Sequence, residues 1–183
     1  MPTRAYVAFL RGVNLGTQRR VNMAELRELL AGHGHVDVRT YLQSGNVVLG
    51  SELTAARLER ALEHQLAAGL GFEVDVLVRT GDELAAILKH DPLRKVAKDP
   101  ARYLVTFLRR ASSRQVVDRL AAAEVGREQV VAKGRELYSW HPDGVGRSQL
   151  AKLLQPKALG VPASARNWRV VGHLAGLVGE GSG

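Results

Sequence analysis

The sequence has no cysteine among its 183 residues. The chain therefore has no disulfide framework, no thiolate nucleophile, and no zinc or iron–sulfur cluster held by cysteine. No apolar stretch approaches the roughly 20 residues that a membrane-spanning helix needs. The first residues, one arginine followed by a short apolar run, do not have the pattern of a targeting segment. These absences predict a cytoplasmic protein with no membrane partner.

Aromatic residues are also few, at 5% of the chain, whereas basic residues are in excess. There are 26 Lys and Arg against 18 Asp and Glu, which gives a formal net charge of +8 at neutral pH. A positive balance suits nucleic acid, phosphorylated ligands or another anionic partner, although it says nothing about the fold. The strand expected from Tyr103 lacks the pattern of an RNA-recognition motif, so no recognised motif supports nucleic-acid binding, and that hypothesis rests on the charge and on the arginines beside Trp168.

Apolar periodicity predicts two units with the same order of elements. The first unit is expected to contain a strand at 5–10, a helix from Asn22, strands at 36–42 and 47–49, a helix from Thr54 and a strand at 72–78. The second is expected to contain a strand at 103–108, a helix at 113–123, strands at 128–132 and 136–140, a helix from Ser148, and a final helix over about 165–178 in place of the last strand. The expected fold class is therefore α+β, with two similar βαββα(β) two-layer sandwich subdomains in a ferredoxin-like element order.

The boundaries of these units follow from changes in composition. We expect a first subdomain over 1–79, a helical connector over 80–101, a second subdomain over 102–178 and a disordered tail over 179–183. The helix of the connector begins at the capping box of Thr80 and Glu83. The tail, Gly-Glu-Gly-Ser-Gly, has almost no apolar surface to bury.

The loop after the first strand is the first candidate binding element. It leaves a strand and leads to a helix N-terminus, where free N–H groups and the helix dipole favour an anion. Its candidate ligand-binding residues are Arg11, Gly12, Asn14 and Gly16. The loop fits neither of the glycine-rich nucleotide motifs. The alternative is structural: the two glycines allow a tight crossover and the arginines are solvated.

The turn between the second and third strands is the second candidate. Gln43, Ser44 and Asn46 gather two amides and a hydroxyl at one end of the sheet, and they are candidate ligand-binding residues. A hairpin turn also needs Gly and Asn for their tolerance of positive φ, so these residues have a structural explanation too. Ser44 lacks the elbow motif of a serine nucleophile.

The third candidate is the segment that opens the last expected helix. Arg166, Asn167 and Arg169 flank Trp168, a combination that could grip a phosphate or stack on a base. Trp168 lies on the apolar stripe of the expected helix, so core packing is its alternative role.

A glycine-bearing loop from His141 to Ser148 meets a further expected helix start. Ser148 is expected to cap that helix. His141 and Asp143 could act as an acid–base pair or as metal ligands, but their spacing does not define a site. We therefore predict no metal site and no cofactor, and no catalytic residue is identified.

Four segments in this order resemble a known bacterial family, called domain of unknown function 1697. The segments are residues 9–16, 23–27, 38–48 and 166–169. The resemblance covers essentially the whole chain and implies an α+β fold of two similar, intertwined subdomains, but the biochemical function of the family is not established. Thr17 and Ala165 depart from the pattern of the family. A threonine is usual where Ala165 stands, and its absence removes a hydroxyl that a ligand could use.

Three hypotheses about function follow. The first is a protein that binds an anionic, phosphate-bearing small molecule or nucleic acid in a cleft between the subdomains, lined by 11–16, 43–46 and 166–169. The second is an enzyme for a small phosphorylated or carboxylated metabolite. In that enzyme Arg11 or Arg166 would hold the anion, and Ser44, His141 or Asp143 would move protons. The third is a structural or regulatory interaction module. The sequence does not determine the oligomeric state.

Overall fold

The computed structural model describes residues 2–180 and divides into two compact units. Unit 1 contains the residues up to Ile87 together with those from His173 onward, and unit 2 contains Leu88–Gly172. Two helices, α3 (Gly81–His90) and α7 (Trp168–Glu180), each contribute residues to both units. The helix expected in a connector is thus divided between the two compact units.

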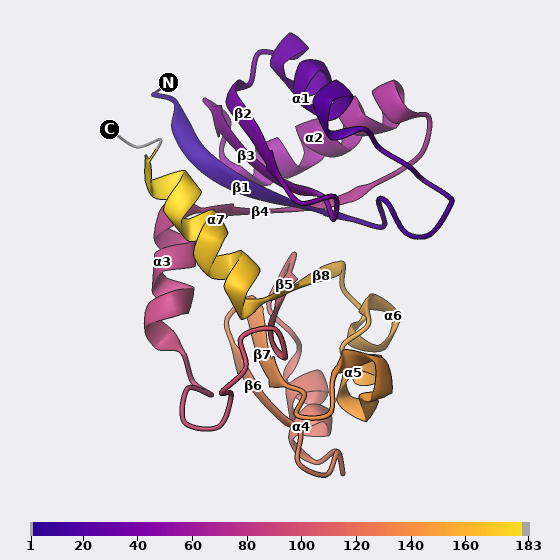
Figure 1. Ribbon diagram of the computed structural model, residues 1–183, viewed down its shortest axis with the longest axis vertical. Coiled ribbons are helices and arrows are strands. Elements are labelled where there is room, and N and C mark those ends of the chain that lie inside the picture. The colour runs from indigo at the N-terminus through magenta and orange to yellow at the C-terminus, as the bar shows by residue number, and fades with distance from the viewer. Residues whose placement is uncertain (1, 181–183) are drawn as a thin grey trace. The chain divides into compact units, whose positions relative to one another are not determined.

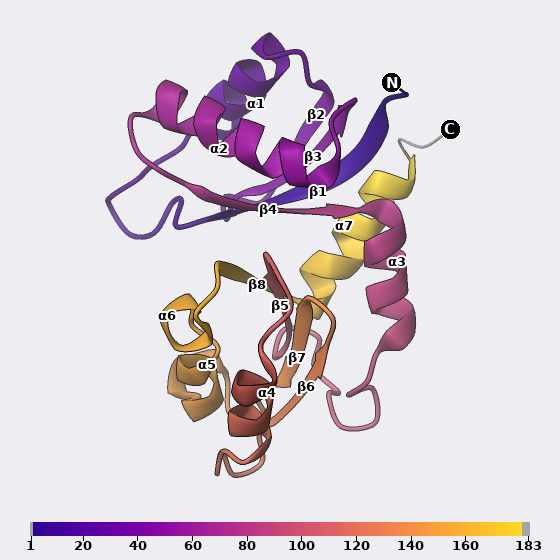
Figure 2. The same cartoon turned by 180° about the vertical axis from the view of Figure 1, so that it is seen from behind.

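Unit 1 is a four-stranded antiparallel sheet with helices α1 and α2 on one face (Figures 1 and 2). The strand order is β2-β3-β1-β4. The complete elements are β1 (Arg4–Arg11), α1 (Met23–Gly32), β2 (Val36–Tyr41), β3 (Asn46–Ser51), α2 (Ala55–Leu70) and β4 (Asp75–Thr80). This is the βαββαβ order expected from the sequence.

The alternation of side chains along the strands builds the core of unit 1. Tyr6, Ala8 and Leu10 of β1 face α1 and α2 and belong to one buried cluster. Val7 and Phe9 point to the other face of the sheet and are also fully buried. Because successive side chains of a strand alternate between faces, a strand that is apolar on both sides must be covered on both sides.

Residues of α7 lie against the sheet face opposite to α1. Arg39 and Tyr41 of β2 alternate with Thr40, whose hydroxyl accepts a hydrogen bond from Arg27 of α1. Tyr41 stacks on His173, with 3.9 Å between ring centroids. The Arg39 guanidinium donates to the carbonyl oxygen of Leu177 at 2.8 Å. The C-terminal part of α7 therefore completes unit 1.

Unit 2 repeats the same topology with a different set of helices. Its sheet order is β6-β7-β5-β8, which corresponds position by position to the order in unit 1. The elements are β5 (Tyr103–Leu108), α4 (Arg114–Ala121), β6 (Gln129–Lys133), β7 (Glu136–Trp140), the 3-10 turn η1 (Val145–Arg147), α5 (Gln149–Leu153), α6 (Pro156–Leu159) and β8 (Ala163–Asn167). The structure confirms the α+β class, the two similar subdomains and the ferredoxin-like order.

The last strand of unit 2 differs from the expectation. The helix expected from about residue 165 begins at Trp168, and Ala163–Asn167 form β8, which pairs antiparallel with β5. Thr106 of β5, for example, lies opposite Ala165. The five residues of β8 contain no β-branched residue, so only the neighbouring strand reveals them as a strand.

The C-terminal end also differs in part from the disordered tail expected over 179–183. Gly179 and Glu180, expected in the tail, belong to α7. The remaining residues of the expected tail, 181–183, lie outside the residues that the structure describes.

Candidate functional site

The loop between β1 and α1 and the turn between β2 and β3 form a pocket of about 400 Å³, called here the unit 1 pocket. It is lined by Asn14, Gly16, Arg20, Val21, Asn22 and Gln43. Pockets that hold small molecules have volumes of roughly 300–1,000 Å³. The unit 1 pocket therefore has the size of a small-ligand site.

Asn14 holds the two parts of the pocket together. Its side-chain amide donates to the carbonyl oxygens of Val21 at 3.2 Å and Gln43 at 2.7 Å, and its side-chain oxygen accepts the Val21 N–H at 2.7 Å. Its backbone N–H donates to the carbonyl oxygen of Arg19 at 3.0 Å, which closes the loop on itself. Asn14 has φ of 54°, a left-handed conformation that Asn tolerates better than most residues. Because both amide hydrogens are used, Asn14 positions the pocket and does not offer these groups to a ligand.

The β2–β3 turn is fixed just as firmly against the end of β1. The Leu10 N–H donates to the Gly45 carbonyl oxygen at 2.8 Å. Asn46 is fully buried, and its amide donates to the Tyr41 carbonyl oxygen at 2.9 Å and to the Ser44 hydroxyl at 3.0 Å. The hydroxyl of Ser44 and the amide of Asn46 are thus bonded to each other within the turn.

Three other groups at the pocket are available to a ligand. Arg20 is exposed, and no carboxylate pairs with its guanidinium among the residues that the structure describes. Asn22 caps α1 with its side-chain oxygen, which accepts the Ala24 N–H at 2.8 Å, and the amide nitrogen of Asn22 is left to donate. Gln43 engages Asn14 only through its backbone carbonyl. A guanidinium and two amides at one pocket form a set of donors suited to an anion.

The other arginines near the β1–α1 loop have partners. The Arg11 guanidinium lies 4.0 Å from the carboxylate of Asp75, on the neighbouring strand β4. The Arg19 guanidinium lies over the ring of Phe72, 5.5 Å from its centroid, which is within cation–π distance. Arg20 is therefore the arginine of this loop that lines the pocket.

The structure brings together some of the residues singled out from the sequence and separates others. Asn14, Gly16 and Gln43 line the unit 1 pocket, whereas the lining does not include Arg11, Gly12, Ser44 or Asn46 of the same two segments. The binding residues chosen from the sequence did not include Arg20, Val21 or Asn22. The expected cap at Asn22 was the available signal, because residues just before a cap lie beside the open helix end.

Arg166 and its neighbours belong to unit 2, where they have local partners. The Arg166 guanidinium donates to the Ser164 hydroxyl at 2.7 Å and to the Ala165 carbonyl oxygen at 2.8 Å. Burial lowers the pKa of this guanidinium to about 10, so it remains charged at neutral pH.

The side chains after Arg166 shape the start of α7. The Asn167 side-chain oxygen accepts the Val170 N–H at 2.9 Å, as a helix cap does. Trp168 stacks on Tyr103 with 4.5 Å between ring centroids and 9° between the planes. Trp168 thus packs within unit 2, and Arg169 is exposed.

His141 and Asp143 do not form an acid–base pair. His141 is fully buried and bonds to Ser139 at 2.8 Å, Ser148 at 2.8 Å and Glu128 at 3.0 Å. Asp143 is exposed and pairs with the Arg127 guanidinium at 2.8 Å. The His141 imidazole is therefore at the centre of a buried hydrogen-bond network in unit 2.

The carboxylate of Glu128 anchors that network and carries a shifted pKa. Burial by itself raises the pKa of Glu128, but hydrogen bonds from Ser148, the Leu150 N–H and His141 outweigh it and hold the pKa below its usual value of 4.5. The Leu150 N–H donates to Glu128 at 3.0 Å, which ties the start of α5 to the strand region before β6.

This shift predicts a loss of stability in acid. Because the folded pKa lies below the unfolded one, the unfolded chain takes up the proton first as the pH falls. The stabilisation by Glu128 is complete above pH 4.5 and is lost as the pH falls through the folded pKa. Urea unfolding at a series of pH values should show Glu128→Gln less stable than the native chain at neutral pH, with the difference shrinking in acid. A difference that stays constant from neutral to acid pH would contradict this assignment.

Within residues 2–180, no three His, Asp or Glu side chains group as a metal site would need. No helix within the same range combines the length and the apolar character needed to cross a membrane.

Comparison with known proteins supports the fold. A family model described as "Protein of unknown function (DUF1697)" matches residues 3–138. The conserved bacterial protein SP0830 from Streptococcus pneumoniae aligns over 97% of this chain and 99% of its own, with 23% identity and a TM-score of 0.71. A second solved structure, that of TA0507, is 12% identical with a TM-score of 0.28, too low to indicate a shared fold. No curated protein matches the sequence. The likeness to SP0830 shows a shared fold.

Proposed function

The chain belongs to the DUF1697 family of proteins of unknown function, and from that premise we propose that unit 1 binds a small phosphate-bearing ligand in the unit 1 pocket. The observation that carries the proposal is the exposed Arg20 guanidinium without a carboxylate partner, beside the available amides of Asn22 and Gln43. Hydrogen bonds from a guanidinium to a phosphate are charge-assisted and about twice as strong as neutral ones.

The surroundings of the pocket favour an anion over a cation. No acidic side chain lines it. The pocket also adjoins the first turn of α1, where the positive end of the helix dipole lies; the acidic residue of that turn, Glu25, is exposed and is not part of the lining. The absence of a carboxylate from the lining lowers the electrostatic energy of a negative group held at Arg20.

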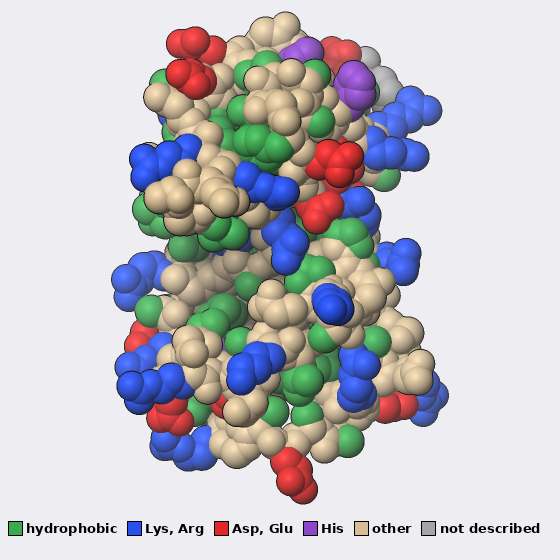
Figure 3. All heavy atoms as spheres, turned by 90° about the vertical axis from the view of Figure 1, so that its right-hand side faces the viewer, with side chains coloured by type: hydrophobic (Ala, Val, Ile, Leu, Met, Phe, Trp, Pro, Cys, Tyr) green, Lys and Arg blue, Asp and Glu red, His purple; other side chains and the backbone are tan. Residues whose placement is uncertain are grey.

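The volume of the pocket favours a small molecule over a nucleic-acid strand. At about 400 Å³ the pocket accommodates one compact ligand. On the face drawn in Figure 3, the Lys and Arg side chains are interspersed with apolar, neutral and acidic ones, without a continuous basic stripe. A strand would need such a stripe, because its affinity comes from many phosphate contacts.

Ribose 5-phosphate, with ribose as the phosphate-free comparison, tests this proposal. In an NMR titration of the whole protein, ribose 5-phosphate should shift the backbone amides of residues 14–22 and 43, and ribose should not. Arg20→Gln should weaken binding about 10-fold, the usual effect of losing one charge-assisted hydrogen bond. Arg57→Gln is the matched control, since Arg57 is an exposed arginine of α2 outside the pocket.

Three results would contradict the proposal. The first is the absence of chemical-shift changes at these amides. The second is an equal loss of affinity for ribose 5-phosphate in Arg20→Gln and Arg57→Gln. The third is tight binding of a single-stranded oligonucleotide that weakens steeply with salt and is reduced by Arg20→Gln. That result would favour nucleic acid as the ligand of this surface.

A further inference from the structure

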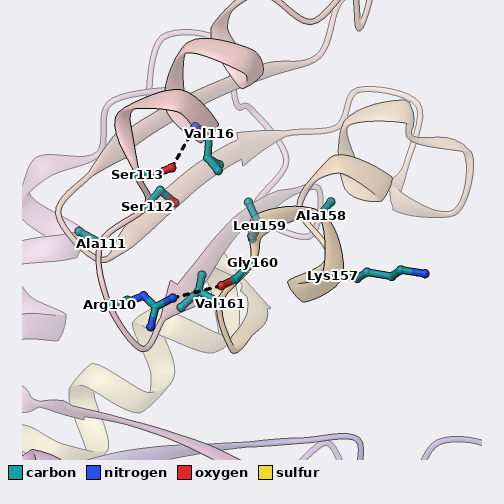
Figure 4. A pocket seen from close by; sticks show the side chains of 10 residues that line it. All are labelled: Arg110, Ala111, Ser112, Ser113, Val116, Lys157, Ala158, Leu159, Gly160 and Val161. Atoms are coloured by element: carbon teal, nitrogen blue, oxygen red, sulfur yellow. Dashed lines mark hydrogen bonds between the residues drawn. The ribbon is translucent and has the colours of Figure 1, made fainter.

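Unit 2 contains a pocket of its own, of about 380 Å³, called here the unit 2 pocket (Figure 4). Its lining comes from the β5–α4 loop at 110–113, from Val116 of α4, from 157–159 of α6, and from 160–161 in the segment that joins α6 to β8. It lies wholly within unit 2, so it is independent of the unit 1 pocket and of the function proposed for it.

Polar donors gather on one side of the unit 2 pocket. Arg110 is exposed, and its guanidinium donates a long hydrogen bond of 3.4 Å to the Gly160 carbonyl oxygen. Ser113 accepts the Val116 N–H at 3.3 Å, which leaves the hydroxyl hydrogen of Ser113 to donate. The Ser112 hydroxyl oxygen is shielded from solvent, yet it has no hydrogen-bond partner among the described residues. An unpaired buried hydroxyl is costly, so a partner supplied by a ligand would be stabilising.

The charge of the unit 2 pocket is positive. Lys157 stands at its rim, and in Figure 4 its side chain extends from α6 away from the other lining groups. No acidic side chain is part of the lining. The first turn of α4 also lacks acidic residues, so nothing there opposes an anion near Arg110 and Ser113.

The remaining walls are apolar. Val116, Leu159 and Val161 contribute aliphatic side chains, and Leu159 and Val161 belong to the core of unit 2. A bare inorganic anion would leave these walls in contact with water. The lining therefore fits a ligand that has both an anionic group and an apolar body.

The internal repeat indicates what that body is. Because the two sheets have the same strand order, the β1–α1 loop and the α2–β4 junction of unit 1 correspond to the β5–α4 loop and the α6–β8 junction of unit 2. In unit 1, Phe72 of the junction lies beneath Arg19 of the loop, 5.5 Å from guanidinium to ring centroid. In unit 2, the junction has Gly160 and Val161 and no aromatic residue, and both of them line the pocket together with Arg110.

We propose that the unit 2 pocket binds a small aromatic phosphate ester, whose ring takes the place that Phe72 fills in unit 1. The phosphate is held by Arg110 and by the hydroxyls of Ser112 and Ser113. Lys157 adds charge at the rim.

Phenyl phosphate tests both the phosphate and the aromatic ring of the proposed ligand. Inorganic phosphate, which lacks the ring, and phenol, which lacks the phosphate, are the comparison compounds. In an NMR titration of the whole protein, phenyl phosphate should shift the amides of 110–116 and 157–161, and it should bind at least about 10-fold more tightly than either comparison compound. These amides are distinct from those of the unit 1 pocket, so binding at each pocket is followed separately in the same NMR spectrum.

Two variants and one control complete the experiment. Arg110→Gln should weaken phenyl phosphate about 10-fold. Ala111→Phe should fill the pocket and abolish binding, while the far-ultraviolet circular dichroism stays native. Arg147→Gln is the matched control, because Arg147 is an exposed arginine of unit 2 outside the pocket. The proposal would be overturned if phenyl phosphate bound no more tightly than inorganic phosphate. It would also be overturned if Arg110→Gln and Arg147→Gln reduced the affinity for phenyl phosphate equally.

Discussion

Replacing Gly45 by alanine is expected to lower the free energy of unfolding by about 3 kcal/mol, from left-handed strain of about 1–2 kcal/mol and overpacking of about 1–3 kcal/mol. Gly45 has φ of 80°. A Cβ atom at this position would lie 2.7 Å from Cγ2 of Val13 and 2.8 Å from Cβ of Leu10. Both neighbours are buried, so neither can move aside without disturbing the end of β1. Urea unfolding followed by circular dichroism measures the loss.

Gly34→Ala separates the two contributions. Gly34 also has positive φ, at 86°, but no heavy atom lies within 4 Å of the position that its Cβ would take. This variant should therefore lose only the backbone part, about 1–2 kcal/mol. Equal losses in the two variants would mean that the contact of Gly45 with β1 is looser than the structure shows.

Replacing His141 by alanine is expected to destabilise unit 2 by about 3–4 kcal/mol. The substitution removes hydrogen bonds to Ser139, Ser148 and Glu128 and leaves their polar atoms buried around a new cavity. Ser139 is fully buried, so water cannot replace the lost partner without opening the unit. Both tryptophans, Trp140 and Trp168, lie in unit 2, and their fluorescence during urea unfolding reports its stability.

Asp143→Ala is the matched control for His141→Ala. Asp143 lies two residues further on, and its ion pair with Arg127 is exposed, with 68% and 76% of the two side chains accessible. Exposed ion pairs contribute about 0–1 kcal/mol, so this variant should be almost as stable as the native chain. If His141→Ala lowered the free energy of unfolding no more than Asp143→Ala does, the buried network would have no structural role.

Local patterns predicted several helix starts correctly. Ser148, the expected cap of α5, accepts the Ala151 N–H at 2.7 Å, whereas Thr54 precedes α2 without a side-chain cap bond. The capping box at the start of α3 has both of its bonds, from Thr80 to Glu83 and back. These interactions join residues three apart, so the sequence contains everything that forms them.

The candidate site was predictable only in part. Asn14 and Gln43 were both singled out, but the bond that joins them spans 29 positions and creates the pocket. Arg20 was not chosen as a binding residue, because nothing in its neighbourhood in the sequence distinguishes it from Arg19. Phe72, far away in the sequence, lies beneath Arg19, and Arg20 is left free for the pocket.

The sequence by itself determined the order of elements in unit 1, the cap at Ser148, the capping box at Thr80, the positive-φ turn at Gly45 and the excess of positive charge. These properties depend on side-chain periodicity and on interactions over a few residues. Only the tertiary structure decided that Ala163–Asn167 form a strand, that His141 is buried in a network, and that each unit has a pocket of its own. The physical reason is that strand pairing, burial and enclosed volume depend on groups brought together from distant positions of the chain.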